Sequence, residues 1–284
     1  MQFVKMHGLG NDFIIFPEEE TGGVSSWSSF ALQVCDRHRG VGGDGVILVL
    51  SSSVADLRMR IFNSDGSEAE MCGNGIRCLA KFAFERGIVN KKEFTVETKA
   101  GIIIPRITEE EKGKVKRVRV NLGKPRFRPE EIPVAVEGEE VRNYPLEGGG
   151  RAFLFSALSL GNPHVVIFEI PPEWEKYGRE IENHPIFPNK TNVEFVEVKN
   201  RKEAVVKVWE RGAGATLACG TGAAATLIAG VREGKLDREA TIHLPGGPLK
   251  VEWQEEVYIE GPAEEVFRGE INEEVEKKWK LLSG

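Results

Sequence analysis

Two of the cysteines, Cys72 and Cys219, are each followed by a glycine, a variable residue and a second glycine. The local sequences are CGNG at 72–75 and CGTG at 219–222, and apolar residues at helical spacing come after both. Each cysteine is therefore predicted to lie at the start of a helix, where the first backbone amides lack an intrahelical partner and carry partial positive charge. Glycine lets the backbone approach a ligand there. Such a position suits a carboxylate and is expected to lower the pKa of a thiol.

A pair of such thiols suits the inversion of an amino acid at its Cα atom. One thiolate would remove the Cα proton, and a thiol on the opposite side would return a proton with the opposite hand. The helix amides would bind the carboxylate and stabilise the negative charge that develops beside it. This chemistry calls for no metal and no cofactor, but it requires both helix starts to open on one dry cleft.

The elements that would position the two cysteines are repeated within the chain. Residues 58–75 match residues 205–222 in their order of strand, glycine turn and C-G-x-G. The two cysteines are 147 positions apart, and the same offset relates Asn63 to Glu210. Two more pairs of segments keep this order, namely 45–50 with 192–197 and, after a small insertion, 10–16 with 161–168. The repeat predicts a duplicated domain.

The expected fold class is α+β, with two pseudo-symmetric lobes from a duplicated domain. Each lobe is predicted to be a mostly antiparallel sheet or barrel wrapped around a central helix. Many short runs rich in Val, Ile and Phe, bounded by Gly, Pro, Asn and Asp, predict the strands. The central helices are predicted over 73–87 and 220–232, and two shorter helices over 27–38 and 174–183.

The two lobes are expected to divide the chain near its middle. The N-terminal lobe, residues 1–122, carries Cys72, and the C-terminal lobe, residues 123–267, carries Cys219. The segment 121–130 is rich in proline, glycine and charge, as linkers are. The tail, residues 268–284, is expected to be able to return to the first lobe.

Composition and charge indicate a soluble globular protein. Hydrophobic residues make up 40% of the chain and charged residues 29%, with a formal net charge of −6. This acidic balance does not favour binding to nucleic acid or to an anionic membrane. The uncharged stretch 212–231 is too rich in glycine and alanine for a membrane span. Because no secretory leader is recognisable, we expect a cytoplasmic protein with reduced thiols.

Other interpretations of the cysteines carry different weight. A redox or structural disulfide between Cys72 and Cys219 is the main rival hypothesis. A zinc site is less favoured, since neither cysteine belongs to a C-x-x-C pair and histidines are few. Cys35 and Cys78 lie in predicted helices without a glycine turn and are expected in the core. The match to G-x-G-x-x-G at 40–45 precedes a strand and does not open a helix, so no dinucleotide site is expected.

The motifs around these residues resemble those of the diaminopimelate epimerase family. The resemblance runs in order from the first residues to about residue 260, and it rests on HGLGNDF at 7–13, NSDGSEAEMCGNG at 63–75, GNPH at 161–164, TNVEF at 191–195 and ERGAGATLACGTG at 210–222. It implies two lobes, each with a sheet around a central helix. It also implies interconversion of LL- and meso-diaminopimelate without pyridoxal phosphate or metal, on the route to lysine and, in many bacteria, peptidoglycan. A homodimer is plausible for this family.

The resemblance also implies a role for each matching residue. Cys72 and Cys219 would transfer the proton, and His164 and Glu210 would tune them. Arg211 would bind the distal carboxylate through its planar fork, and Glu210 would also meet the reacting amino group. The remaining residues would hold the substrate, the first four of them through backbone donors to the reacting carboxylate: Gly73, Asn74, Gly220, Thr221, Asn11, Asn63, Asn162 and Asn192.

Simpler structural roles are open for several of these residues. Each asparagine could instead serve a turn or a helix cap. Glu210 and Arg211 could merely end a strand, and His164 could be an ordinary surface histidine.

One position departs from the family pattern. Gly45 stands where the family usually has glutamine, so that side-chain contact is absent, replaced by water or made by a neighbour such as Asp44.

Four other functions compete with this one. A proline or hydroxyproline racemase would not need Arg211, because proline has no distal carboxylate. A phenazine-type isomerase would not need both cysteines. A purely structural binding module would not explain two thiols at matched helix starts. A redox switch built around a Cys72–Cys219 disulfide is the alternative from a different class, and a count of free thiols under native conditions would distinguish it from an epimerase.

Overall fold

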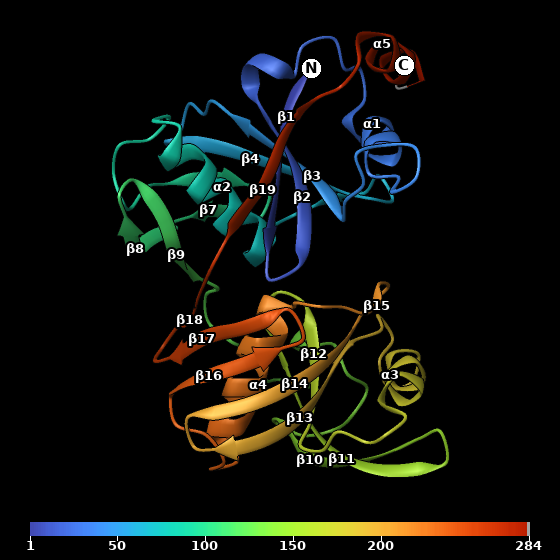
Figure 1. The fold of residues 1–284 in the computed structure, drawn as a ribbon. Helices are drawn as coiled ribbons and strands as arrows, with labels where there is room; N and C mark the ends of the chain where they lie inside the picture. The colour runs from blue at the N-terminus through green and yellow to red at the C-terminus, as the bar shows by residue number, and fades with distance from the viewer. Residues whose placement is uncertain (283–284) are drawn as a thin grey trace. The chain divides into compact units, whose positions relative to one another are not determined.

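The computed structural model describes residues 1–282, which form two compact units (Figure 1). The first unit contains Met1–Val120 and the chain from Gly261 onward, and the second contains Asn121–Glu260. No helix within residues 1–282 is long and apolar enough to cross a membrane.

The first unit is built on a sheet with the strand order β19-β1-β2-β3-β4-β6-β7, and β5 pairs with β4 outside this series. The strands β8 and β9 form an antiparallel hairpin after β7. The bounds are β1 Gln2–Gly8, β2 Asn11–Pro17, β3 Gly45–Leu50, β4 Leu57–Asn63, β5 Glu68–Ala69, β6 Val96–Thr98, β7 Gly101–Ile103, β8 Arg106–Glu111, β9 Lys114–Asn121 and β19 Glu264–Glu270, with a 3-10 turn η1 at Glu18–Glu20.

The second unit is built on a sheet with the order β10-β11-β12-β13-β14-β16-β17-β18, and β15 pairs with β14. The bounds are β10 Val141–Gly148, β11 Arg151–Ser159, β12 Pro163–Ile167, β13 Asn192–Asn200, β14 Glu203–Glu210, β15 Gly214–Ala215, β16 Glu239–Leu244, β17 Gly247–Trp253 and β18 Val257–Gly261, with a 3-10 turn η2 at Pro129–Glu131.

The two sheets repeat one topology, strand for strand. In the first unit, β1-β2-β3-β4-β6-β7 are joined by antiparallel, parallel, antiparallel, parallel and antiparallel pairings. In the second unit, β11-β12-β13-β14-β16-β17 follow the same series. Asn63 and Glu210 are the last residues of the matched strands β4 and β14. The expected fold class, with two similar lobes and mostly antiparallel sheets, is confirmed.

A buried helix of 13 residues lies at the centre of each unit (Figure 1). The helix α2, Gly73–Glu85, packs against β1, β2, β3, β4 and β8. The helix α4, Gly220–Arg232, packs against β11, β12, β13, β14, β16 and β17. Small residues let α4 approach its surroundings: a Cβ atom at Gly230 would lie 2.6 Å from the Leu236 side chain. Both central helices lie where the sequence predicted them.

The shorter helices are α1, Trp27–Val34, and α3, Trp174–Glu182. The first ends sooner than the predicted residue 38, because the side chain of Asp36 accepts hydrogen bonds from the backbone amides of His38 and Arg39, both at 2.8 Å. These bonds hold residues 36–39 in a turn that competes with the helix.

The last described helix, α5, spans Glu273–Leu282 and packs on α1. The Trp279 ring lies edge-on to Phe30, with 5.9 Å between ring centroids. The tail therefore belongs to the first unit.

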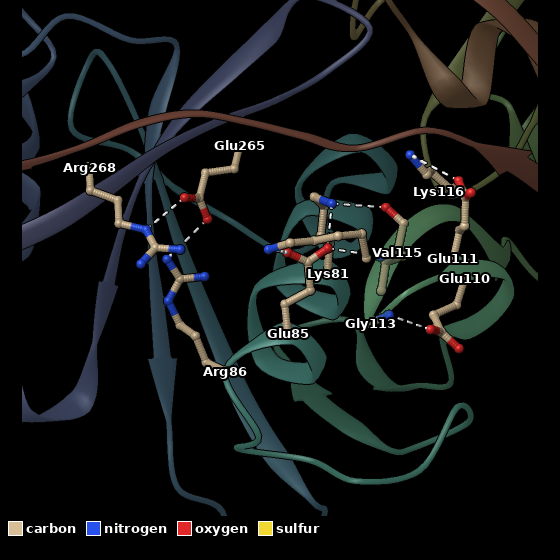
Figure 2. Close-up of polar contacts among 11 residues, drawn as sticks. Lys81, Glu85, Arg86, Glu110, Glu111, Gly113, Val115, Lys116, Glu265 and Arg268 are labelled. Atoms are coloured by element: carbon tan, nitrogen blue, oxygen red, sulfur yellow. Dashed lines mark hydrogen bonds and ion pairs between the residues drawn. The ribbon is translucent and has the colours of Figure 1, made fainter.

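Polar contacts anchor the C-terminal half of α2 (Figure 2). Lys81 Nζ donates to Glu85 at 2.5 Å and to the Val115 carbonyl at 2.8 Å, and the Val115 amide donates to Glu85 at 2.8 Å. Glu265 of β19 pairs with Arg86 at 3.1 Å. The helix is thus tied to β9 and β19, which fixes the direction in which its N-terminus points.

Buried thiols make the first unit sensitive to alkali. Burial raises the pKa of Cys78, which is fully enclosed on α2, from an ordinary value of 9.0 to about 12. Between these values the unfolded chain loses the proton while the folded chain keeps it, so the free energy of unfolding falls as pH rises. One thiol contributes a slope of about 1.4 kcal/mol per pH unit.

Replacement of Cys78 should remove the contribution of this thiol to the fall of the unfolding free energy with pH. We expect Cys78→Ala to unfold more easily than the parent protein at pH 7, because packing is lost, but to lose less stability between pH 9 and pH 11. The measurement is denaturant unfolding of both proteins, under reducing conditions, at each pH. Curves that stay parallel above pH 9 would contradict the assignment.

Candidate active site

Cys72 is the N-cap residue of α2. Its backbone is extended, with φ −141° and ψ 121°, and its sulfur accepts a hydrogen bond from the Gly75 amide at 3.5 Å. The position normally suits Ser, Thr, Asp or Asn, which accept the same bond through oxygen. A cysteine in this role holds its sulfur beside the positive end of the helix. Gly73 and Asn74 are the first two residues of the helix, as the sequence predicted.

A chain of side-chain amides leads away from Cys72. The thiol lies 3.7 Å from Asn11 Oδ1, and that oxygen also accepts from Asn74 Nδ2 at 3.1 Å. At one end Asn74 Oδ1 accepts from Arg77 at 2.9 Å, and at the other Asn11 Nδ2 donates to Asp44 at 2.9 Å. A cation and a carboxylate therefore fix which way each amide points. The structure brings Asn11 and Asn74 to Cys72.

Gly45 is the first residue of β3 and lies opposite Asn63 in the register of β4. A Cβ atom at Gly45 would lie 2.6 Å from the Phe62 carbonyl oxygen, so this backbone has no room for a side chain there. Asp44 does not replace the missing glutamine directly, since its carboxylate is engaged by Asn11 and by Arg37 at 2.9 Å. Its effect is to orient Asn11.

Asn63 and Asp12 flank this amide chain. Asn63 is exposed, and its side-chain amide donates to Ser67 Oγ at 2.9 Å. Although burial opposes it, hydrogen bonds from Arg37 and Lys5 lower the pKa of Asp12 to about 2. The Asp12 carboxylate therefore stays charged and holds Arg37 beside Asp44.

Cys219 caps α4 in the same way. Its backbone has φ −118° and ψ 107°, and its sulfur accepts from the Gly222 amide at 3.3 Å. The Thr221 hydroxyl lies 3.5 Å from the sulfur. Gly220 and Thr221 begin the helix, matching Gly73 and Asn74.

The electrostatic surroundings of Cys219 differ from the expectation. Burial, followed by the charges of Glu210 and Glu194, raises the pKa of the Cys219 thiol well above its ordinary value, while Thr221 and the Gly222 amide lower it less. The predicted lowering at a helix start is therefore wrong for this cysteine. A side chain only 5% exposed and close to two carboxylates keeps its proton.

Glu210 is hydrogen-bonded to this thiol. Its Oε1 atom also accepts from the Thr216 hydroxyl at 2.5 Å. Burial raises the pKa of Glu210, against the opposing effects of Thr216, Cys219 and the charge of His164. A carboxyl group with a raised pKa that touches a thiol is suited to exchange a proton with it.

His164 lies in a hydrogen-bonded chain that leads to Cys219. Its Nδ1 atom is 2.7 Å from Glu194 Oε1, and its Nε2 atom is 3.0 Å from Asn162 Oδ1. Asn162 Nδ2 donates to Thr221 at 3.3 Å, and Thr221 contacts the sulfur. Both His164 and Glu194 are fully buried, so the alternative of an ordinary surface histidine is wrong.

Glu194 is a site residue that the sequence reasoning missed. It lies on β13, and its Oε2 atom is buried without a hydrogen-bond partner among residues 1–282. A Cβ atom at Gly222 would lie 2.8 Å from Glu194 Oε1, so the glycine of the C-G-x-G pattern makes room for this carboxylate. The signal available beforehand was a glutamate placed between two apolar residues, Val193 and Phe195.

Asn192 is the first residue of β13, and Arg211 directly follows the last residue of β14. The Arg211 backbone amide donates to Asn192 Oδ1 at 2.9 Å, and Asn192 Nδ2 donates to the Pro163 carbonyl at 2.8 Å. Asn192 is thus buried as a brace between two backbone segments. The Arg211 side chain is exposed and contacts only the Asn189 carbonyl, at 3.2 Å, among the described residues. Its remaining donors can receive a carboxylate.

Glu182, on α3, fixes this turn and was also missed. Its two oxygens accept from the Trp209 indole and from the Gly212 backbone amide, both at 2.8 Å. These residues stand directly before Glu210 and directly after Arg211. A buried carboxylate therefore holds both ends of the dipeptide that carries two predicted site residues.

Comparison with known proteins supports one family throughout the chain. The family model described as diaminopimelate epimerase matches residues 3–128 and 156–266. A diaminopimelate epimerase from Heliobacterium modesticaldum is 53% identical over 282 residues, covering 95% of this chain and 99% of that protein. One from Carboxydothermus hydrogenoformans is 53% identical over 277 residues, with coverage of 95% and 99%.

Solved structures with the same fold are more distant in sequence. A Bacillus anthracis phenazine biosynthesis protein of the PhzF family superposes with a TM-score of 0.67 at 20% identity, covering 96% of this chain and 99% of that one. A probable proline racemase from Agrobacterium radiobacter gives a TM-score of 0.69 at 17% identity, with coverage of 96% and 93%. At these identities the likeness concerns the two-lobed fold alone.

The clamp made by Glu182 can be tested without any substrate. In Glu182→Gln one oxygen becomes an amide group, which cannot accept, so one of the two bonds is lost at a cost of about 1–3 kcal/mol. We expect the Gly212 amide to exchange with solvent about tenfold faster or more, as measured by hydrogen–deuterium exchange.

Glu175→Gln, an exposed position on the same helix, is the matched control and should leave this exchange unchanged. If neither the Gly212 amide nor the Trp209 indole N–H exchanges faster in Glu182→Gln than in the parent protein, the clamp is ruled out.

Proposed function

The chain belongs to the diaminopimelate epimerase family, and from this premise we propose that it interconverts LL- and meso-2,6-diaminopimelate by a two-base mechanism. The observation that carries the proposal is the pair of matched N-cap cysteines, Cys72 and Cys219, on the central helices of a duplicated fold. In the part of the chain that the structure describes, no other pair of thiols combines helix-start amides with polar side chains.

The proton transfer divides between the two cysteines. The thiolate at Cys72 takes the Cα proton and becomes a thiol, while the pair of electrons stays on the substrate beside its carboxylate. The thiol at Cys219 gives its proton to the other face of Cα and becomes a thiolate. The raised pKa of Cys219 supports its part as the initial donor. Reversal of both steps, or exchange with solvent, restores the starting state.

Glu210 can exchange this proton with Cys219, and His164 is linked to the thiol by hydrogen bonds. Glu210 touches the sulfur, and His164 reaches it through Asn162 and Thr221. In our proposal Glu210 and His164 tune the thiol, and Glu210 also receives the amino group of the reacting centre.

The substrate carboxylates are assigned to two different kinds of donor. The reacting carboxylate is bound by backbone amides at Gly73, Asn74, Gly220 and Thr221, which begin the two helices. The distal carboxylate is bound by Arg211, whose exposed guanidinium has a planar fork that matches a carboxylate. Asn11, Asn63, Asn162 and Asn192 complete the contacts or hold them in place.

Two competing functions fit the residues around the cysteines less well. A proline or hydroxyproline racemase would leave Arg211 without a carboxylate to bind. A redox switch would use the cysteines as a disulfide and would not need Glu210 and His164 around one of them. Relatives about half identical over nearly the whole chain favour the diaminopimelate substrate.

The biological setting follows from the substrate. Within this proposal the enzyme is cytoplasmic, needs no cofactor, and serves the formation of lysine and of peptidoglycan precursors. We also propose that it works as a homodimer, which sedimentation of the purified chain would test.

The decisive experiment is proton NMR of LL-diaminopimelate in D₂O with the reduced enzyme. We expect deuterium to enter one Cα position as the meso isomer appears, with no cofactor added and a chelator present. This outcome follows because the returned proton comes from a thiol that exchanges with solvent. Absence of both exchange and inversion, with the thiols reduced, would exclude this substrate.

Replacing each cysteine by itself distinguishes a two-base mechanism from a one-base mechanism. Cys72→Ala and Cys219→Ala are each expected to lower turnover by a factor of about 10² or more, since each removes one proton carrier. Each variant should still exchange the Cα proton of one isomer only, as measured by the same NMR assay. Cys35→Ala, which alters a core thiol, is the control and should remain active. Normal inversion in either catalytic variant would refute the mechanism.

A further inference from the structure

Arg77, in the second turn of α2, is a fully buried cation. Its guanidinium donates to the Gly73 carbonyl at 2.9 Å, to Asn74 Oδ1 at 2.9 Å and to the Pro262 carbonyl at 3.2 Å. All three acceptors are neutral. Among residues 1–282, no carboxylate lies within ion-pair distance of Arg77, although it is 0% exposed.

Such an arrangement is costly for the fold. The desolvation penalty of a buried charge is not offset when no opposite charge is near it. Hydrophobic residues of similar size often make a protein more stable than such a charge does. Burial accordingly lowers the pKa of Arg77. An arginine nevertheless stays protonated in proteins, so a positive charge remains in the core of the first unit.

The position of the charge connects it to Cys72. Arg77 bonds to both of the residues that directly follow this cysteine, and the charges of Cys78 and Cys72 act on its guanidinium. It also holds Asn74 so that the amide nitrogen of Asn74 faces Asn11. The guanidinium thus adds a full charge to the partial positive charge of the helix start.

The internal repeat shows that this charge distinguishes the two lobes. At the offset of 147 residues, Arg77 corresponds to Ala224 on α4. Conversely, the buried Glu194 corresponds to Ile47, and Glu210 corresponds to Asn63. One thiol therefore has a buried cation near it, and the other has two carboxylates.

We propose that Arg77 is a positioning residue that supplies the built-in countercharge of the first lobe, favouring the anionic form of Cys72 and the binding of the substrate carboxylate at the start of α2. The proposal deepens the proposed function and rests on it. In this arrangement the resting enzyme holds one proton for two sulfurs, and that proton is on Cys219. Arg77 does not touch the reacting atoms; it acts through Gly73 and Asn74.

The other ionisable groups around α2 are mostly matched by partners. Lys5 of β1 pairs with Asp12 of β2 at 2.6 Å, and Lys81 pairs with Glu85 at 2.5 Å. The further charged groups on the elements that pack against α2 are His7 with Glu264, Arg58 with Glu97, Arg60 with Glu68, Arg106 of β8 with Glu93, Glu110 with Lys92, Glu109 with Arg117, and Glu111 with Lys116. Arg77 is the charge without such a match.

The contact between Cys72 and Asn11 acts in the opposite direction. Asn11 Oδ1 lies 3.7 Å from the Cys72 sulfur and favours the protonated thiol. A sulfur–oxygen contact of this length is weak beside a full charge buried in the same helix turn, because the low dielectric of the interior strengthens charge effects.

The test measures the thiolate itself, independently of turnover. The rate at which iodoacetamide alkylates Cys72 is followed by peptide mass spectrometry between pH 6 and pH 10 in the parent protein and in Arg77→Met. Because only the thiolate reacts, we expect alkylation of Cys72 in the variant to be about tenfold slower at pH 7 and to recover at higher pH. Arg77→Lys, which keeps the charge, should restore most of the rate.

Matched controls separate charge from structure. Arg86→Met removes a cation at the C-terminal end of α2, about 13 Å along the helix axis from Arg77. This variant should leave the alkylation profile of Cys72 unchanged. Thermal unfolding shows whether each variant is folded, and Arg77→Gln replaces Arg77→Met if that variant is not.

The outcomes discriminate between the hypotheses. An unchanged Cys72 profile in a folded Arg77→Met or Arg77→Gln overturns the role of Arg77, whether or not the enzyme epimerises diaminopimelate. A shifted profile in a protein that does not act on diaminopimelate would retain the countercharge and refute only the substrate. In an active enzyme, Arg77→Met should lower kcat and raise KM for diaminopimelate, while Arg77→Lys recovers both.

Discussion

A buried helix needs hydrogen-bond acceptors for the backbone amides of its first turn. The way in which this chain supplies those acceptors determines where its candidate catalytic groups lie. Both central helices are enclosed by a sheet, so water and distant side chains are poor sources of acceptors. The chain provides a sulfur at each N-cap, which accepts from the amide three residues later. The same bond places a reactive atom at the one end of the helix where negative charge is stabilised. In each lobe, one cysteine thus both caps the helix and provides the sulfur atom that the proposed chemistry needs.

Duplication preserved this backbone solution and changed the charges around it. The order of strand pairings is the same in both units, and Asn63 and Glu210 still end matched strands. Yet α4 is almost wholly apolar where α2 encloses Arg77 and Lys81. Conversely, β13 carries Glu194 where β3 has only apolar side chains. Backbone geometry is set by many weak contacts and tolerates little change, whereas single buried charges can be exchanged if hydrogen bonds receive them.

How far the sequence predicts the structure depends on the range of the interactions involved. The bounds of α2 and α4 and the two capping cysteines follow from local pattern, because glycine turns and apolar periodicity act over a few residues. The early end of α1 depends on one Asx turn at Asp36. Glu182 and Glu194 were missed because their roles arise from contacts 27–30 residues apart in sequence. The direction of the pKa shift at Cys219 was wrong for a related reason: helix-start amides are local and visible in the sequence, whereas burial and nearby carboxylates belong to the folded state.

Under the proposed two-base mechanism, the asymmetry between the lobes addresses a difficulty inherent in the inversion. At the start of each turnover one sulfur must lack a proton and the other must hold one. Two identical sites would share the proton equally and would also populate the doubly protonated and doubly deprotonated forms, neither of which can invert Cα in one passage. Opposite charges buried beside the two sulfurs disfavour these unproductive forms, since a cation stabilises a thiolate and carboxylates stabilise a thiol. A duplicated fold therefore gains from divergence at Arg77, Glu194 and Glu210, while its capping residues have to stay the same.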